Sequence, residues 1–197
     1  PLAAYRTLET VLDMPFSYAD LFETATKGVR SQNELAQESS EVADFWNMLQ
    51  GFQTSGKCVD KAHYRIRYMK SFRPISVKED IEFKEARPIL YLNMAAVASL
   101  FNSRNMNATA NRSNWSTITS YLKSHSSFLG LKQDRFTILL PSGLPDYSIE
   151  IVNNEQVRKI KVNRPKALCF DYLQLKEAFG LELETEMVSD AQDSEGV

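Results

Sequence analysis

Apolar residues recur at three- and four-residue steps through the first part of the chain, the spacing of one face of an amphipathic helix. The pattern runs through 2–12 and again through 18–29, where Ser17 can cap the second helix. A polar link at 31–38 follows. The next apolar stripe ends near Gly56 and consists of Val42, Phe45, Trp46, Leu49 and Phe52. We therefore expect three helices, with these aromatic residues in the core.

The period changes to two from position 64, as expected of a strand. Aromatic and aliphatic side chains at 64, 66 and 68 alternate with Arg65 and Arg67. This alternation predicts a half-buried strand with a basic outer face. Positions 88–92 are apolar without alternation, which fits a strand covered on both faces. The charged connector 75–87 between them has room for a further short strand at 81–83.

The second half of the chain alternates helical and extended patterns. A hairpin is expected because Pro141, Gly143 and Pro145 separate two apolar runs. Asp171 is expected to cap the last helix and Gly180 to end it. The predicted elements are helix 94–103, loop 102–112, helix 113–126 capped by Ser113, paired strands 135–140 and 147–152, strand 157–162, buried strand 167–170 and helix 172–179.

The order of one helix, a strand, two helices and a hairpin resembles a winged helix. The predicted fold class is α+β, with N-terminal helices, a winged-helix-like core, an added antiparallel β-sheet and a C-terminal helix. The resemblance implies that helix 113–126 enters the major groove and that the 141–146 loop is the wing. The implied base readers are Asn114, Thr117, Ser120 and Lys123, and the implied phosphate contacts are Arg104, Arg112 and Lys132. Winged helices also serve as protein–protein modules, which is the alternative.

Composition and charge divide the chain further. Its 197 residues are 43% hydrophobic and 24% charged, which is typical of a globular protein. The net charge of −2 conceals a segment, 181–197, with six acids and no base. The rest is mildly basic. We expect a helical segment at 1–38 that trails an upstream domain, a winged-helix-like α+β domain at 39–181, and a disordered acidic tail at 182–197. Pro1 in place of an initiator Met suggests a fragment.

Basic residues gather on the predicted strands at 61–73 and 158–166 rather than on helix 113–126. Lys and Arg side chains on exposed strand faces can neutralise nucleic-acid phosphates. A sequence-nonspecific contact with DNA is therefore expected. The residues assigned to it are Arg65, Arg67, Arg112, Lys123, Arg158, Lys159 and Lys161.

Motifs for catalysis or cofactor binding are weak. The stretch 51–58 fits G-x-x-x-x-G-K, but Cys58 replaces the Ser or Thr, and a helix precedes it where a strand is required. His63 and His125 have no metal-ligand companion, and Cys58 and Cys169 are expected to be reduced structural thiols. No catalytic residue, cofactor or metal is predicted. No apolar run approaches the ~20 residues that span a bilayer, so a cytoplasmic location is expected.

Several short sequence segments along the chain resemble the C-terminal region of primase/helicase-type replication proteins of bacterial mobile elements and phages. They are Ala4–Leu8 with 14–16, Gln32-Asn33 with 45–47, 64–68, 87–92 and 167–172. The resemblance implies an upstream ATPase or primase domain and a non-catalytic accessory role here, with contacts to DNA or to neighbouring subunits of a homo-oligomer. The alternative is an assembly domain that docks the ATPase or another partner through apolar patches around Tyr18, Phe22 and Trp46.

Overall fold

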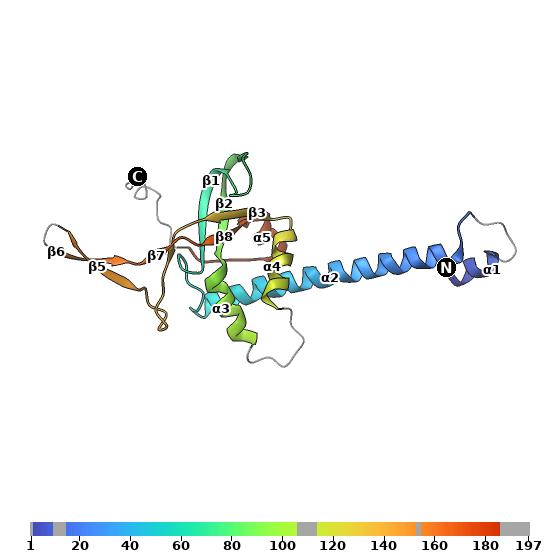
Figure 1. Ribbon diagram of the computed structural model, residues 1–197, viewed down its shortest axis with the longest axis horizontal. Helices are drawn as coiled ribbons and strands as arrows, with labels where there is room; N and C mark the ends of the chain where they lie inside the picture. Colours follow the sequence, from blue (N-terminus) through green and yellow to red (C-terminus); the bar gives the residue numbers. More distant parts are fainter. Residues whose placement is uncertain (1, 10–14, 106–113, 153–154, 186–197) are drawn as a thin grey trace. The chain divides into compact units, whose positions relative to one another are not determined.

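The computed structural model describes residues 2–9, 15–105, 114–152 and 155–185. The chain divides into two compact units, Pro1–Val42 and Ala43–Val197. Figure 1 labels the elements along the chain. Those that begin before residue 60 are the helices α1 (Leu2–Glu9) and α2 (Tyr18–Thr54).

The start of α2 matches the sequence prediction. Ser17 Oγ accepts a hydrogen bond from the Asp20 N–H at 3.1 Å, and the Asp20 carboxylate accepts from the Ser17 hydroxyl at 2.6 Å. The predicted break at 31–38 is wrong, because α2 is one helix of 37 residues. The polar link contains neither Gly nor Pro, so nothing in its backbone chemistry ends the helix.

A four-stranded antiparallel sheet forms the centre of the second unit (Figure 1). Its strand order is β1-β2-β8-β3. The charged connector contributes more than expected, because β2 starts at its residue Ile81 and continues to Asn93 as one strand of 13 residues. The four strands are β1 (Tyr64–Phe72), β2 (Ile81–Asn93), β8 (Lys166–Asp171) and β3 (Phe128–Gln133). The α+β class with antiparallel sheets is thereby confirmed.

One face of the sheet is covered by helices. Trp46 of α2 contacts Phe170 of β8 with ring centroids 5.2 Å apart, and both side chains are almost fully buried. The helices α3 (Met94–Asn105) and α4 (Trp115–Ser124) join this layer, because the Trp115 ring lies 5.4 Å from Phe101 and 6.2 Å from Phe45. The expectation of a core position is confirmed for Phe45 and Trp46, whereas Phe52 is half-buried.

The other face carries a second apolar cluster, which confirms that the strand at 88–92 is covered on both faces. Phe136 belongs to the short strand β4 (Phe136–Thr137), which pairs with β7 (Val162–Asn163). The cluster of buried residues is Phe72, Ile89, Tyr91, Phe136, Ala167 and Cys169. Gly130 of β3 is required here, because at its φ of +132° an added Cβ would lie 2.7 Å from the Pro74 Cβ.

The predicted pairing of 135–140 with 147–152 is wrong. The turn is tighter than the predicted 141–146 loop. Leu140 N–H donates to the Leu144 carbonyl and Asp146 N–H to the Ile138 carbonyl, both at 2.8 Å. The chain then continues into a separate hairpin, which we call the β-arm, formed by β5 (Tyr147–Val152) and β6 (Glu155–Ile160). The turn that contains Pro141 and Gly143 reverses the chain within four residues. Residues 147–152 therefore do not pair with 135–140 and pair instead with the strand that follows them.

The last helix follows the prediction. In α5 (Tyr172–Phe179) the Asp171 carboxylate accepts from the Leu173 N–H at 3.1 Å and the Gln174 N–H at 3.4 Å. Gly180 ends the helix with a left-handed φ of 63°. Asp171 is 2% exposed, and Arg87 balances its charge through an ion pair of 2.7 Å.

Candidate nucleic-acid interface

Arg65 and Arg67 lie on one face of β1, as predicted, but they do not form a free basic surface. Arg67 makes a two-pronged contact with the Asp134 carboxylate, with nitrogen–oxygen distances of 2.9 and 3.1 Å. Arg65 lies 3.9 Å from the same carboxylate and donates to the Arg135 carbonyl at 3.0 Å. Their side chains are only 20% and 29% exposed. Asp134, absent from the predicted site, therefore organises this part of the surface.

Two further arginines converge on this cluster from other segments. Arg135 follows β3 in the chain and Arg164 precedes β8, and both are exposed. The cavity between them has a volume of about 330 Å³. We call this cavity the arginine pocket; its lining residues are Arg67, Gln133, Asp134, Arg135 and Arg164.

The arginine pocket carries a net positive charge. Three of its lining residues are arginines and one is an aspartate, and Arg65 lies beside that aspartate, so positive charges are in excess. No ion pair with an acid is found for the Arg135 or Arg164 side chain among the residues that the structure describes. Guanidinium groups stay protonated at every physiological pH and offer paired N–H donors to phosphate. This arrangement suits an oxyanion of the nucleic-acid backbone.

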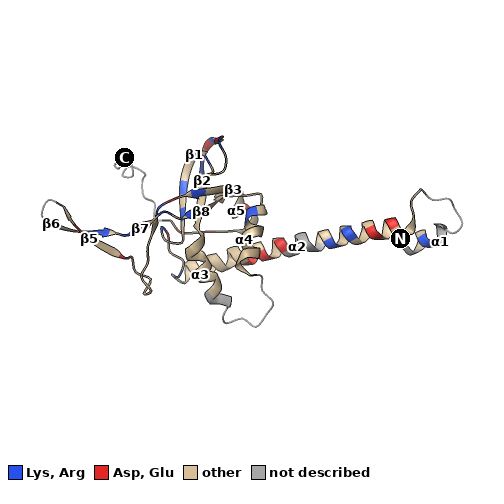
Figure 2. Ribbon diagram, in the orientation of Figure 1, with Lys and Arg blue, Asp and Glu red and all other residues tan. Residues whose placement is uncertain are grey.

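The β-arm and the two residues that flank it, Asp146 and Lys161, hold three of the predicted DNA contacts, and each contact residue has a partner there. Arg158 lies over the Tyr147 ring at 4.8 Å from its centroid. Lys159 pairs with Glu150 at 3.2 Å, and Lys161 pairs with Asp146 at 2.8 Å. Figure 2 shows both signs of charge on this hairpin. From 146 to 161 three acids equal three bases, so the β-arm has no surplus charge to attract DNA.

The remaining predicted contacts lie elsewhere. Lys123 is on α4, in a groove separate from the arginine pocket. Arg112 lies outside the described residues. The predicted cap Ser113 lies there too, and Asn114 caps α4 by accepting from the Thr117 N–H at 2.9 Å. Its side-chain oxygen is therefore committed to the helix, and Asn114 is a poor base reader.

The loop at 51–58 is not built to hold phosphate. Gly56 has a φ of 72° just after the end of α2, as expected of a residue that stops a helix. The N–H groups of Lys57 and Cys58 both donate to the Phe52 carbonyl, at 2.8 and 3.0 Å. These amides cannot also surround a nucleotide phosphate.

The buried titratable groups are structural. Both cysteines are free and buried, as predicted. Burial, with a smaller effect of Asp60, raises the pKa of the Cys58 thiol to about 12, so it is neutral and unreactive. Burial lowers the pKa of His63, whose Nδ1 accepts from the Val59 N–H at 3.0 Å. Among the described residues, no group of three or more His, Cys, Asp or Glu could hold a metal ion.

The predicted apolar docking patch separates into two kinds of residue. Trp46 is 1% exposed and belongs to the core, so it cannot meet a partner. Phe22 is 52% exposed and stacks on Tyr18 within α2, with ring centroids 6.0 Å apart. In the part of the chain that is described, no helix has both the length and the apolar character needed to cross a membrane.

Sequence reasoning found half of the arginine pocket. The alternating pattern identified Arg65 and Arg67, and the basic run before the last strand included Arg164. Asp134 and Arg135 lie outside the predicted basic strands. No local pattern connects them to β1, because Asp134 is 67 positions from Arg67 in the sequence. No family model and no curated protein matches this sequence, and no solved structure matches the chain.

Proposed function

We propose that this chain is a non-catalytic accessory domain of a DNA-replication primase or helicase, which contacts the DNA backbone without strong sequence specificity. The arginine pocket is the observation that carries the proposal. Three arginines from three separate segments line one cavity that holds a single carboxylate, Asp134, and Arg65 approaches the same carboxylate to 3.9 Å. Such a cluster favours phosphate over any neutral ligand.

The proposed contact is with phosphate rather than with base edges. Asn114 is used as a helix cap, and the exposed side of α4 carries Lys123 as its single cation within the described helix. Direct base reading normally uses several polar side chains that project together into a groove. In the winged-helix interpretation, which remains part of the proposal, α4 would be the recognition helix and the turn at 141–146 the wing. We assign both of them positioning roles only.

The parent protein is proposed to act in the cytoplasm, with an ATPase or primase domain upstream in the same chain. The short segments that resemble primase/helicase-type replication proteins support the proposed upstream domain. The arginine pocket supports the proposed DNA contact. Catalysis is assigned to the upstream domain, and no residue of this chain is given a chemical step.

The test is a DNA-binding titration of the full chain by fluorescence anisotropy at low salt, with single-stranded and duplex oligonucleotides. Binding should weaken by more than about tenfold between ~50 and ~200 mM salt if several phosphates are contacted. The informative variant is R135E/R164E, because no described residue forms an ion pair with either side chain. Reversal at Arg65 and Arg67 is less clean, since it would also break the Asp134 contacts. Absence of binding at ~50 mM salt sinks the proposal.

A protein-interaction or assembly domain is the second candidate, and the β-arm favours it. Ile149 and Ile151 are 66% and 74% exposed on this electrically balanced hairpin. An isolated two-stranded hairpin is marginally stable in water, so a covering partner would stabilise it. Substituting both with Thr should abolish self-association, or binding to the upstream domain, while DNA affinity is retained. Unchanged association with both partners would remove this candidate.

A further inference from the structure

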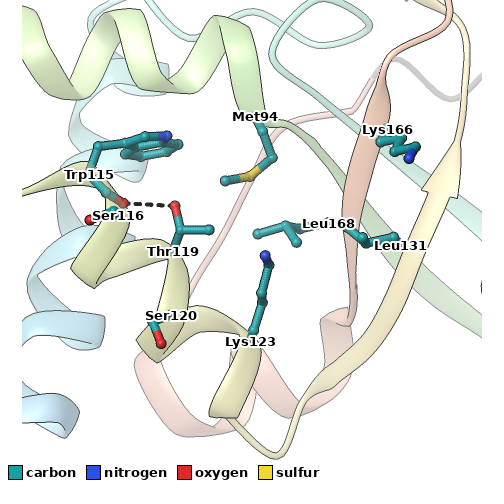
Figure 3. A pocket seen from close by; sticks show the side chains of 9 residues that line it. All are labelled: Met94, Trp115, Ser116, Thr119, Ser120, Lys123, Leu131, Lys166 and Leu168. Carbon is teal, nitrogen blue, oxygen red and sulfur yellow. Dashed lines mark hydrogen bonds between the residues drawn. The ribbon is translucent and has the colours of Figure 1, made fainter. Parts of the chain in front are cut away.

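A groove between α4 and the β3–β8 pair combines an aromatic ring, an apolar floor and positive charge. Its volume is about 600 Å³, which is typical of a cavity that holds a small organic group (Figure 3). None of the residues that line it is acidic. The residues that give the groove its character are Met94, Trp115, Lys123, Leu131, Lys166 and Leu168.

Trp115 offers an aromatic surface to this groove. Its side chain is half-buried and lines the cavity, whereas Trp46, the other tryptophan of the chain, is 1% exposed in the core. The rings of Phe45 and Phe101 meet the Trp115 ring at interplanar angles of 47° and 50°, so neither is stacked flat on it. A flat ligand in the groove can therefore lie against the part of the Trp115 ring that lines it.

Two lysines supply the positive charge. Lys123 extends from α4 toward Leu168, and Lys166 lies on the opposite side of the groove from Trp115 (Figure 3). Both lysines are exposed, and neither has an ion pair with an acid in the described part of the chain. Their ammonium groups are therefore available to an anion. An aromatic ring flanked by cations matches a nucleotide, which joins a flat base to a phosphate.

We propose that this groove binds a nucleotide of single-stranded DNA, with its base stacked on Trp115 and the adjoining phosphates at Lys123 and Lys166. The inference rests on the proposed DNA contact and narrows it to single strands. The bases of a duplex are paired and stacked on one another, so they cannot reach the ring without leaving the double helix. Stacking uses the flat face that every base has, which agrees with a contact that lacks strong sequence specificity.

The groove and the arginine pocket lie at the same end of the β3–β8 pair. Gln133 lines the arginine pocket and pairs with Lys166, which lines the groove. Arg164 of the arginine pocket precedes Lys166 by two residues, so their Cα atoms are at most ~7 Å apart. Because β3 is the outer strand of the sheet, one DNA strand can pass its edge from the groove to the arginine pocket. The base contact and the backbone contact then involve neighbouring nucleotides.

Tryptophan fluorescence of the full chain tests the proposal. A single strand of thymidine nucleotides should quench the emission, because Trp115 lines the groove while Trp46 is buried, and W115F should remove the quenching. A duplex and a strand of abasic sugars, both of equal length, should bind through their phosphates at low salt and leave the emission unchanged. Thymidine monophosphate should quench only at a concentration about a hundredfold higher, because it lacks the adjoining phosphates.

Affinity variants separate the ring from the lysines. W115L should raise the Kd for the thymidine strand about tenfold and leave the Kd for the abasic strand unchanged, and retained abasic binding also shows that the variant is folded. K123E/K166E should raise the Kd for the thymidine strand about tenfold. K70E/K84E is an equal charge change on exposed lysines of β1 and β2, and it should raise this Kd less than about twofold.

The outcomes distinguish this proposal from the proposed function. Binding of the thymidine strand without a change in emission would overturn the groove and leave the arginine pocket as the DNA contact. Equal quenching by the abasic strand or the duplex would also overturn it, because no unstacked base would be required. Quenching by thymidine monophosphate at the same concentration as by the strand would assign the groove to a free nucleotide instead. Failure of every oligonucleotide to bind at ~50 mM salt would remove the proposed function, and this inference with it.

Discussion

The arginine pocket and the β-arm look alike in sequence and differ in structure. Each brings several basic residues together, and some residues of both were predicted to contact DNA: Arg65 and Arg67 at the pocket, Arg158 and Lys159 on the β-arm. In the arginine pocket, Arg65 and Arg67 share one carboxylate, and the nearby Arg135 and Arg164 leave a positive surplus. In the β-arm, Lys159 and Lys161 each have their own acid and Arg158 lies on a ring. What a basic run can bind therefore depends on its cross-strand partners and not on its count of bases.

The largest expected effect separates the two regions by stability. Phe170 of β8 is fully buried against Trp46, whereas Ile151 of the β-arm is 74% exposed. F170A should lower the free energy of unfolding by about 3–5 kcal/mol, because it removes a buried ring and leaves a cavity. I151A should change it by less than about 0.5 kcal/mol. Urea denaturation followed by circular dichroism measures both, and a large loss for I151A would mean that the β-arm packs on the core.

The second effect concerns DNA affinity. R135E/R164E should raise the Kd for an oligonucleotide about tenfold or more, equivalent to about 1.4 kcal/mol. The matched variant R158E/K159E changes the net charge by the same amount on the β-arm and should raise the Kd less than about twofold. Fluorescence anisotropy at one low salt concentration gives both values. Equal effects would erase the distinction between the regions.

Asp134 predicts a change of the opposite sign. D134N keeps the size of the side chain but removes the charge that neutralises Arg65 and Arg67. DNA affinity should increase about threefold, or about 0.7 kcal/mol. D146N, which frees Lys161 next to the β-arm, is the control and should have little effect. A weaker complex for D134N would show that the aspartate is needed to position the arginines.

The smallest effect is a pH dependence of stability. Burial lowers the pKa of His63 below its ordinary 6.5, so the folded state favours the neutral ring. Its contribution is fully present above pH 6.5 and is lost as pH falls through the folded pKa, because the unfolded chain binds the proton more readily. The melting temperature should therefore fall between about pH 7.5 and pH 5.5. H63Q, which cannot titrate, should flatten this dependence.

Local patterns predicted most elements, because each depends on neighbours in sequence. The cap of Asp171, the stop at Gly180 and the core position of Trp46 follow from spacing alone. Long-range pairing was not predictable in the same way. The alternation at 64–68 placed Arg65 and Arg67 on one face correctly, but it could not show that Asp134 would meet them.

The wrong predictions concern where a helix ends and which strands pair with each other. The polar stretch 31–38 has few apolar residues to reveal its helix, although its helix formers continue α2. The turn after 140 closes between Leu140 and Leu144, and 147–152 pairs with 155–160 in the β-arm instead of with 135–140. Half of the candidate site thus followed from side-chain type and period, and the other half required the tertiary fold.

The salt dependence of DNA binding tests the central claim most directly. The logarithm of the affinity falls linearly with the logarithm of salt concentration, with a slope of about 0.7–0.9 for each phosphate neutralised. If Arg135 and Arg164 each contact a phosphate, R135Q/R164Q should reduce the slope by between about 1.4 and 1.8 relative to the unaltered chain. R158Q/K159Q should leave it unchanged. A slope that is insensitive to Arg135 and Arg164, or that falls equally for the β-arm variant, would contradict the account.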